Sequence, residues 1–165
     1  MKELKFYVMA DPHFFDTALG CSGKEYEDFM HYEQKCFAET ENINKSVFEF
    51  LKKANEADIV LIVGDLSFNG EKKSHEGFLK LLYDLKNSGK KIYVVTADHD
   101  FKWKREDTFA FGENGRYSPE HTEEKSLPKC TKISDSGRLW LLTKSIFLIW
   151  HSFQTMSVLW HSTAI

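Results

Sequence analysis

Residues 59–65 read IVLIVGD: five consecutive branched aliphatic residues followed directly by a glycine and an aspartate. An apolar run of this length without alternation is typical of a strand buried on both faces, as in a parallel sheet. Two further runs have the same character, residues 4–10 before Asp11 and residues 92–95 before Thr96. We therefore expect three short buried strands, each of which ends at polar or acidic residues.

Helical patterns separate the three expected strands. Apolar side chains form one stripe over residues 43–54 and another over residues 78–85, where residues 87–89 (Asn-Ser-Gly) give a stop signal. A weaker pattern over residues 26–37 suggests a further helix. The order strand, helices, strand, helix, strand predicts a layered α/β domain. Its right-handed crossovers bring the C-terminal ends of the strands to one edge of the sheet.

The pattern is less regular beyond residue 101. Residues 102–132 are polar and charged and contain glycine and proline, which favours a long loop or an insertion. Residues 139–142 are expected to form a fourth strand. We predict one α/β domain over residues 1–142, with an incomplete sheet, and a divergent apolar tail over residues 143–165. The aromatic residues of that tail are expected to promote self-association.

The composition fits one folded domain. The 165 residues are 42% apolar and 15% aromatic, which is enough for a buried core and excludes a disordered or low-complexity chain. The net charge of −3 gives no concentrated cationic face, so we expect no nucleic-acid partner. Three cysteines without a C-x-x-C pattern fit a reducing compartment. We expect a cytoplasmic protein without a membrane span, because the apolar stretch over residues 139–160 contains Lys144, His151 and Gln154.

Carboxylates and imidazoles follow each of the three expected strands. In chain order they are Asp11, His13, Asp65, Asp98, His99 and Asp100. Because ligands of an open α/β sheet bind at the carboxyl ends of its strands, we expect these side chains to converge there. Clustered carboxylates repel one another unless a cation neutralises them. Oxygen and imidazole donors suit Mn, Fe, Zn or Mg.

Each of these motifs has a purely structural explanation when it is taken alone. D-x-H occurs by chance in many chains, Gly-Asp after a strand is often a turn with a helix cap, and Asp-His-Asp fits a solvated loop. All three in order, each directly behind a strand pattern, favour a metal site. Asp11 and His13 are two residues apart, so on an extended segment both side chains would point the same way.

The ordered set resembles the calcineurin-like metallophosphoesterase family, in which D-x-H, G-D and G-N-H-[DE] each follow a strand. MADPH at residues 9–13, IVGDLS at residues 62–67 and VVTADHD at residues 94–100 carry the resemblance, which covers residues 4–101. It implies a layered α/β sheet with flanking helices. It also implies a hydrolase that cleaves phosphate mono- or diesters through a dinuclear metal site.

The resemblance also implies roles for the acidic residues. Asp11 and His13 would bind the first divalent ion and Asp65 would bridge both ions. Asp98, which stands where the family has asparagine, would bind the second ion. Two such ions hold a hydroxide and neutralise the phosphoryl oxygens during in-line attack. The extra negative charge of Asp98 is expected to tighten metal binding and to lower activity.

The third motif carries the implied catalytic pair. His99 would act as general acid, or as donor to the phosphoryl or leaving-group oxygen, and Asp100 would fix the orientation of its ring. Ala97 replaces the glycine of the family pattern. If the turn there needs a positive φ, Ala97 costs on the order of 1 kcal/mol.

The later histidine motifs of the family are not matched. The histidines beyond residue 101 are His121, His151 and His161, and none stands in a G-H-x-H pattern. The chain therefore resembles the N-terminal portion of the family, and two functions are open. One is a metal-dependent phosphoesterase acting on small phosphoesters, and the other is a non-catalytic metal-binding or interaction remnant. A flavodoxin-like binding domain ranks last, because no glycine-rich phosphate loop follows the first strand.

Overall fold

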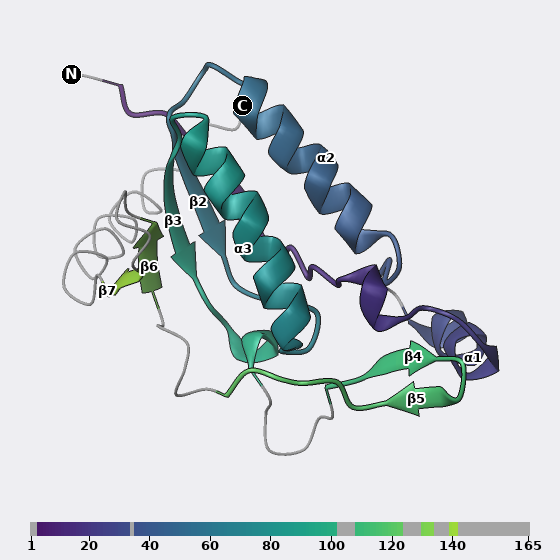
Figure 1. Ribbon diagram of the computed structural model, residues 1–165. Helices are drawn as coiled ribbons and strands as arrows, with labels where there is room; N and C mark the ends of the chain where they lie inside the picture. The colour runs from purple at the N-terminus through teal and green to yellow at the C-terminus, as the bar shows by residue number, and fades with distance from the viewer. Residues whose placement is uncertain (1–2, 34, 102–107, 124–129, 134–138, 142–165) are drawn as a thin grey trace, which may run out of the picture.

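A mixed sheet of five strands, in the order β1-β2-β3-β6-β7, forms the centre of the molecule. The computed structural model describes residues 3–33, 35–101, 108–123, 130–133 and 139–141 (Figure 1). The strands are β1 (Phe6–Ala10), β2 (Ile59–Val63), β3 (Lys91–Val95), β6 (Cys130–Ile133) and β7 (Leu139–Leu141). β1, β2 and β3 are parallel, whereas β6 and β7 are antiparallel to their neighbours. The parallel sheet predicted from the sequence is therefore confirmed.

The register of the parallel strands makes all three end at the same level. Ala10 pairs with Val63, and Val63 pairs with Val95. The loops that begin at residues 11, 64 and 96 therefore leave the sheet side by side. This register brings segments far apart in sequence to one edge.

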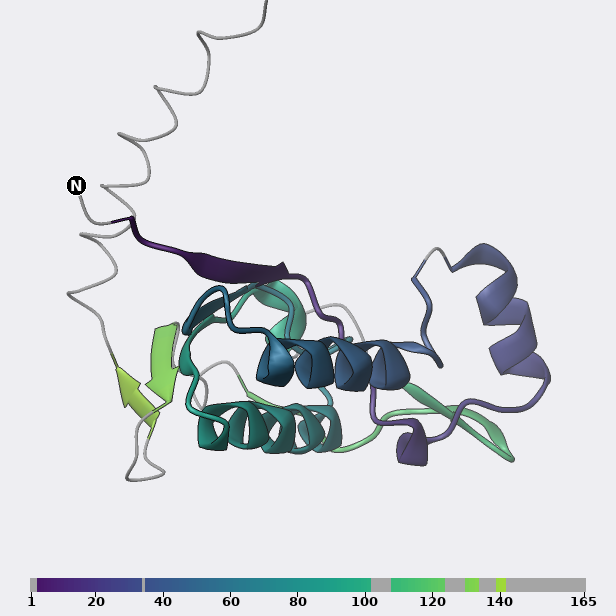
Figure 2. The ribbon, with the colours of Figure 1, turned by 90° about the horizontal axis from the view of Figure 1, so that it is seen from above.

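Two long helices, α2 (Thr40–Lys53) and α3 (Lys72–Asn87), cover one face of the sheet. The other helices are α1 (Lys24–Tyr32) and the short 3-10 helices η1 (Thr17–Leu19) and η2 (Asp98–Asp100), which follow the C-terminal ends of the strands. Figure 2 shows that α2 and α3 lie side by side on the same face. The two long apolar stripes read from the sequence are thus confirmed, and α3 ends where the stop signal predicts, with Gly89 at φ +98°.

The buried side of the sheet packs against the two long helices. Val60 and Ile62 of β2 and Ile92 of β3 are fully buried with Phe48 of α2 and Phe78 of α3. On the opposite face of the sheet Val8 is 60% exposed and Val63 is 43% exposed. The expectation that the strands are buried on both faces is therefore wrong for this face, because both helices pack on the same side.

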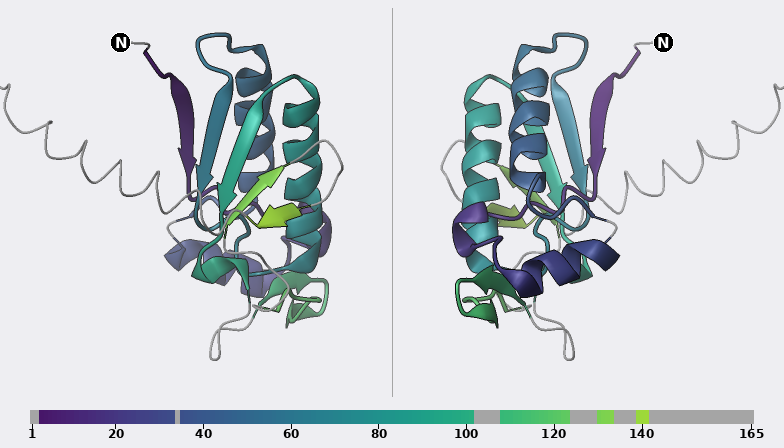
Figure 3. Two further views of the ribbon diagram at one scale, coloured as in Figure 1. Left: turned by 90° about the vertical axis from the view of Figure 1, so that its left-hand side faces the viewer. Right: turned by 90° about the vertical axis from the view of Figure 1, so that its right-hand side faces the viewer.

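A second, aromatic core lies at the edge toward which β1, β2 and β3 run (Figures 1 and 3). It is built from Phe15, Phe37, Phe68, Phe109 and Phe111, which are all buried. The partly buried side of α1 and the hairpin of β4 (Ala110–Gly112) and β5 (Gly115–Tyr117) pack around it. Phe15 and Phe68 belong to the loops after β1 and β2, so these loops are anchored in this core.

The prediction of a long loop over residues 102–132 is wrong in part. The segment contributes the β4–β5 hairpin and the sheet strand β6. The sequence GENG at residues 112–115 is a turn signal for such a hairpin. Gly115 allows the positive φ of +95° that the chain adopts there. The hydrophobic partners of the hairpin come from α1 and from the loop after β1, so no local pattern reveals that it is packed.

Some predictions fall on residues that the structure does not describe. The tail over residues 143–165, with His151 and His161, lies outside the described ranges, so the domain boundary stays a prediction. In the described ranges, no helix has the length and the apolar character needed to cross a membrane.

The close approach of Gly20 to the hairpin gives the first testable prediction. A Cβ at Gly20 would lie 2.3 Å from the carbonyl oxygen of Phe111, and the backbone there has φ +110°. We expect Gly20→Ala to lower the free energy of unfolding by more than 2 kcal/mol, measured by urea denaturation, since backbone strain and a backbone clash add up. Gly89→Ala is the control: its φ is +98° but nothing lies within 4 Å of the added Cβ. Equal losses in the two variants would contradict the close approach.

Candidate functional site

The pairing of β1 with β2 continues beyond the ends of both strands. The N–H of Asp11 donates to the carbonyl of Val63 (3.1 Å), and the N–H of His13 donates to the carbonyl of Asp65 (2.8 Å). Phe14 continues the same ladder. The two loops therefore run as one parallel pair, and this pairing sets His13 beside Asp65.

Three residues of this paired segment have left-handed backbone conformations. Asp11 has φ +49°, His13 has φ +41° and Asp65 has φ +37°, and they are the only non-glycine residues with positive φ in the described ranges. Such conformations cost of order 1–3 kcal/mol each and concentrate at functional sites. The prediction that Asp11 and His13 lie on an extended segment is wrong, because both residues have left-handed rather than extended backbone conformations.

The side chains of these residues gather at the sheet edge. His13 Nε2 lies 3.5 Å from Asp65 Oδ2, and a Cβ at Gly64 would lie 3.1 Å from Asp11 Oδ1. The ring of His99 lies 5.1 Å from the ring of His13, and the two rings are perpendicular. Asp11, His13, Asp65 and His99 are thus brought together from three separate loops.

Asp98 is exposed at the start of η2 and makes no hydrogen bond or ion pair with the other predicted ligands. In the part of the chain that the structure describes, no three His, Cys, Asp or Glu side chains form a group tight enough to hold a metal ion. The candidate metal-binding side chains that lie close together are His13 and Asp65, with Asp11 beside them.

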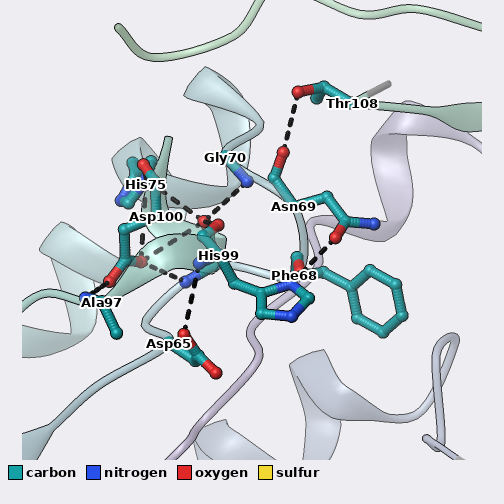
Figure 4. Close-up of polar contacts among 10 residues, drawn as sticks. Asp65, Phe68, Asn69, Gly70, His75, Ala97, His99, Asp100 and Thr108 are labelled. Carbon is teal, nitrogen blue, oxygen red and sulfur yellow. Dashed lines mark hydrogen bonds and ion pairs between the residues drawn. The ribbon is translucent and has the colours of Figure 1, made fainter. Parts of the chain in front are cut away.

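The ring of His99 is held from the loop after β2 (Figure 4). Its Nδ1 lies 2.8 Å from the carbonyl oxygen of Phe68 and 2.9 Å from Asn69 Oδ1. Both partners are acceptors, so we assign the proton to Nδ1, which leaves Nε2 free. The expectation that Asp100 orients this ring is therefore wrong, because Phe68 and Asn69 hold the ring instead. The backbone N–H of His99 also donates to Asp65 Oδ1 (3.3 Å).

Asp100 instead holds the η2 loop against the loop after β2. Its fully buried carboxylate accepts the N–H groups of Ala97 and Ser67, each at 2.9 Å. His75 Nε2 lies 2.7 Å from the Asp100 carbonyl oxygen, and the Ser67 hydroxyl donates to the carbonyl of His99 (3.0 Å). Figure 4 shows this set of contacts around Asp100. Ser67 stands in the second motif, so the sequence placed it near the site but gave it no role.

Ala97 causes no backbone strain. Its φ is −132° and its ψ is −166°, an extended conformation that any residue adopts. The cost expected for an alanine in place of the family glycine therefore does not arise.

Burial lowers the pKa of His13 and so favours its neutral imidazole. Desolvation lowers the pKa of His13 most, the positive charge of Lys35 lowers it further, and the negative charge of Asp65 opposes both. Its buried Nδ1 has no hydrogen-bond partner among the described residues. A neutral imidazole beside two carboxylates is the form that binds a divalent cation, so the donor chemistry of Asp11, His13 and Asp65 fits such an ion.

Glu71, which the sequence analysis did not single out, is a second unusual carboxyl group. It is fully buried at the start of α3, and neither carboxylate oxygen makes a hydrogen bond of normal geometry to a described residue. Burial raises the pKa of Glu71 to about 7, although nearby N–H groups, that of Asn69 first, act in the opposite direction. No local sequence signal marks this burial, because a Glu before a helix ordinarily faces solvent.

Two comparisons with known proteins bear on this geometry. The family model of the calcineurin-like phosphoesterases matches residues 4–161 of the chain. This range extends well beyond residues 4–101, where the three motifs lie. No curated protein matches the chain at a significant level.

The raised pKa of Glu71 gives a pH-dependent stability. The folded state binds the proton up to about pH 7, whereas the unfolded carboxyl releases it near its usual pKa of 4.5. Stability from this group is therefore present below pH 4.5 and is lost as the pH rises through 7. We expect Glu71→Gln to be more stable than wild type at pH 8, by up to about 3 kcal/mol, with a smaller difference at pH 5. Thermal unfolding at both pH values measures this, with exposed Glu76→Gln as the control. Parallel pH profiles for wild type and Glu71→Gln would contradict the burial.

Asp100 and Asp98 are expected to differ sharply when each is replaced. Asp100→Ala leaves two N–H groups without their acceptor, so we expect a loss of about 2–4 kcal/mol in the free energy of unfolding. Asp100→Asn keeps one acceptor oxygen and should lose less. The exposed Asp98→Ala is the matched control and should change stability by less than about 0.5 kcal/mol. Urea denaturation measures all three, and equal losses at the two positions would show that Asp100 does not hold the loop.

Proposed function

The chain belongs to the calcineurin-like phosphoesterase family, and from this premise we propose that it is a metal-dependent hydrolase of small phosphate mono- or diesters. One observation carries the proposal: Asp11, His13 and Asp65 take up strained left-handed conformations at the point where the family motifs meet. Strain of this kind persists only where the surrounding structure over-determines it, and it is common at ligand sites.

Asp11, His13 and Asp65 are the residues that would hold the first divalent ion. Members of the family generally use divalent metal ions, and Mn, Fe, Zn and Mg all suit this donor set. We propose that Asp65 also contributes to a second ion, together with Asp98. Bound divalent ions supply a hydroxide at neutral pH and neutralise negative charge on the phosphoryl group.

His99 is proposed as the group that donates a proton to the leaving-group oxygen. Because its Nδ1 is held by two acceptors, its Nε2 is the nitrogen free to carry and transfer a proton. The ring is fixed by the loop after β2, and the backbone N–H of the same residue contacts Asp65. The proton donor and the proposed metal-binding carboxylate are therefore held by one set of contacts, which favours consistent positioning.

A non-catalytic metal-binding remnant is the second candidate. The observation that favours it is the lack of a tight group of three donors in the described ranges, where Asp98 contacts none of the other predicted ligands. In this case one ion would bind to His13 and Asp65 without turnover.

The two candidates separate in one set of measurements on the full chain. The protein is loaded with Mn²⁺, its metal content is counted by elemental analysis, and hydrolysis of p-nitrophenyl phosphate and its bis ester is followed. We expect Asp65→Ala to lose both metal and activity. His99→Ala should keep its metal and lose activity by about 10²–10⁴-fold, since it removes only a proton donor.

Asp58→Ala is the matched control, because Asp58 is an exposed aspartate at the opposite edge of the sheet, before β2. It should behave as wild type in both assays. About one metal ion per chain with no turnover would support the remnant. Full metal content in Asp65→Ala would contradict both candidates.

A further inference from the structure

Lys35 lies at the rim of the candidate site. It belongs to the connection between α1 and α2, its side chain is half-buried, and its ammonium lies 5.3 Å from the ring centroid of Phe68, over the ring face. Phe68 is the residue whose carbonyl oxygen holds the ring of His99. A separate segment of the chain thus places a positive charge on the ring of Phe68, a residue that also contacts His99.

The ammonium of Lys35 has no ion-pair partner among the residues that the structure describes. Within the described ranges it forms no salt bridge, and the nearby Glu33 uses its carboxylate to accept the backbone N–H of Lys35 (2.9 Å). Its contact is the ring of Phe68, and a cation on an aromatic face keeps its hydrogen-bond donors available. The group is therefore free to bind an anion.

Lys35 also lies within electrostatic reach of the predicted metal ligands. The ring of Phe68, which Lys35 covers, lies 6.1 Å from the ring of His13. An anionic ligand between Lys35 and His13 would be attracted both by the ammonium and by any bound cation.

We propose that Lys35 binds a non-bridging oxygen of the phosphoryl group and so makes the site prefer phosphomonoesters to phosphodiesters. The inference rests on the proposed function and narrows its substrate class. A phosphomonoester carries close to two negative charges at neutral pH, whereas a diester carries one and has one fewer free oxygen. The added positive charge of Lys35 therefore favours the more highly charged monoester.

The test compares the two substrates in one pair of variants. We expect Lys35→Met to lower kcat/KM for p-nitrophenyl phosphate by about 10- to 100-fold, mainly through KM, and for bis(p-nitrophenyl) phosphate by less than about threefold. Lys35→Arg keeps the charge and should restore most of the monoester activity. Lys53→Met, which removes an exposed charge at the far end of α2, is the control and should match wild type. Equal losses on both substrates, or none, would overturn the proposal.

Two further readouts keep this result separate from the proposed function itself. Metal content of Lys35→Met should equal that of wild type, and a loss of metal would overturn the role in substrate binding. Binding of inorganic phosphate to the Mn²⁺-loaded chain, measured by calorimetry, should weaken about tenfold in Lys35→Met and not in Lys53→Met. If wild type hydrolyses neither ester, the proposed function fails. The phosphate affinities then decide alone: weaker binding in Lys35→Met supports the anion site, and equal or absent binding overturns it.

Discussion

The backbone pairing that continues from β1 and β2 into the loops after them is the constraint on which the site depends. Hydrogen bonds from Asp11 to Val63 and from His13 to Asp65 force both loops to run in parallel for several residues beyond the strands. Within this paired segment Asp11, His13 and Asp65 have left-handed conformations. Backbone strain and the gathered donor side chains therefore occur in the same segment.

Two aspartates in the loop after β3 have different roles. Asp100 is fully buried and accepts two N–H groups, which ties η2 to the loop after β2. Asp98, two residues earlier, is exposed and accepts no such backbone hydrogen bonds from the described residues. His99 lies between them with its ring fixed through Nδ1, so the loop presents one oriented imidazole on a rigid support. This division explains why the residue expected to orient His99 serves the backbone instead.

The sequence determined the strands, the long helices and the edge at which polar residues gather, because continuous apolar runs and helical stripes are local patterns. It missed the hairpin of β4 and β5, whose stability comes from aromatic partners far along the chain. It also missed the left-handed turns, since a D-x-H motif gives no information on φ. Residue types at the site could be proposed from their order. The exposure of Asp98 and the hydrogen bonds of His99 to Phe68 and Asn69 depend on the three-dimensional structure. The buried carboxyl of Glu71 had no sequence signal at all.

The central claim is that the paired, strained loop ends of β1 and β2 form the cradle of a cation. Anomalous diffraction from crystals grown with Mn²⁺ tests it most directly. We expect an anomalous peak at the C-terminal edge of the parallel strands, within about 2.5 Å of donor atoms of both His13 and Asp65. An empty edge at saturating Mn²⁺, or a peak bound only by residues elsewhere in the molecule, would contradict it.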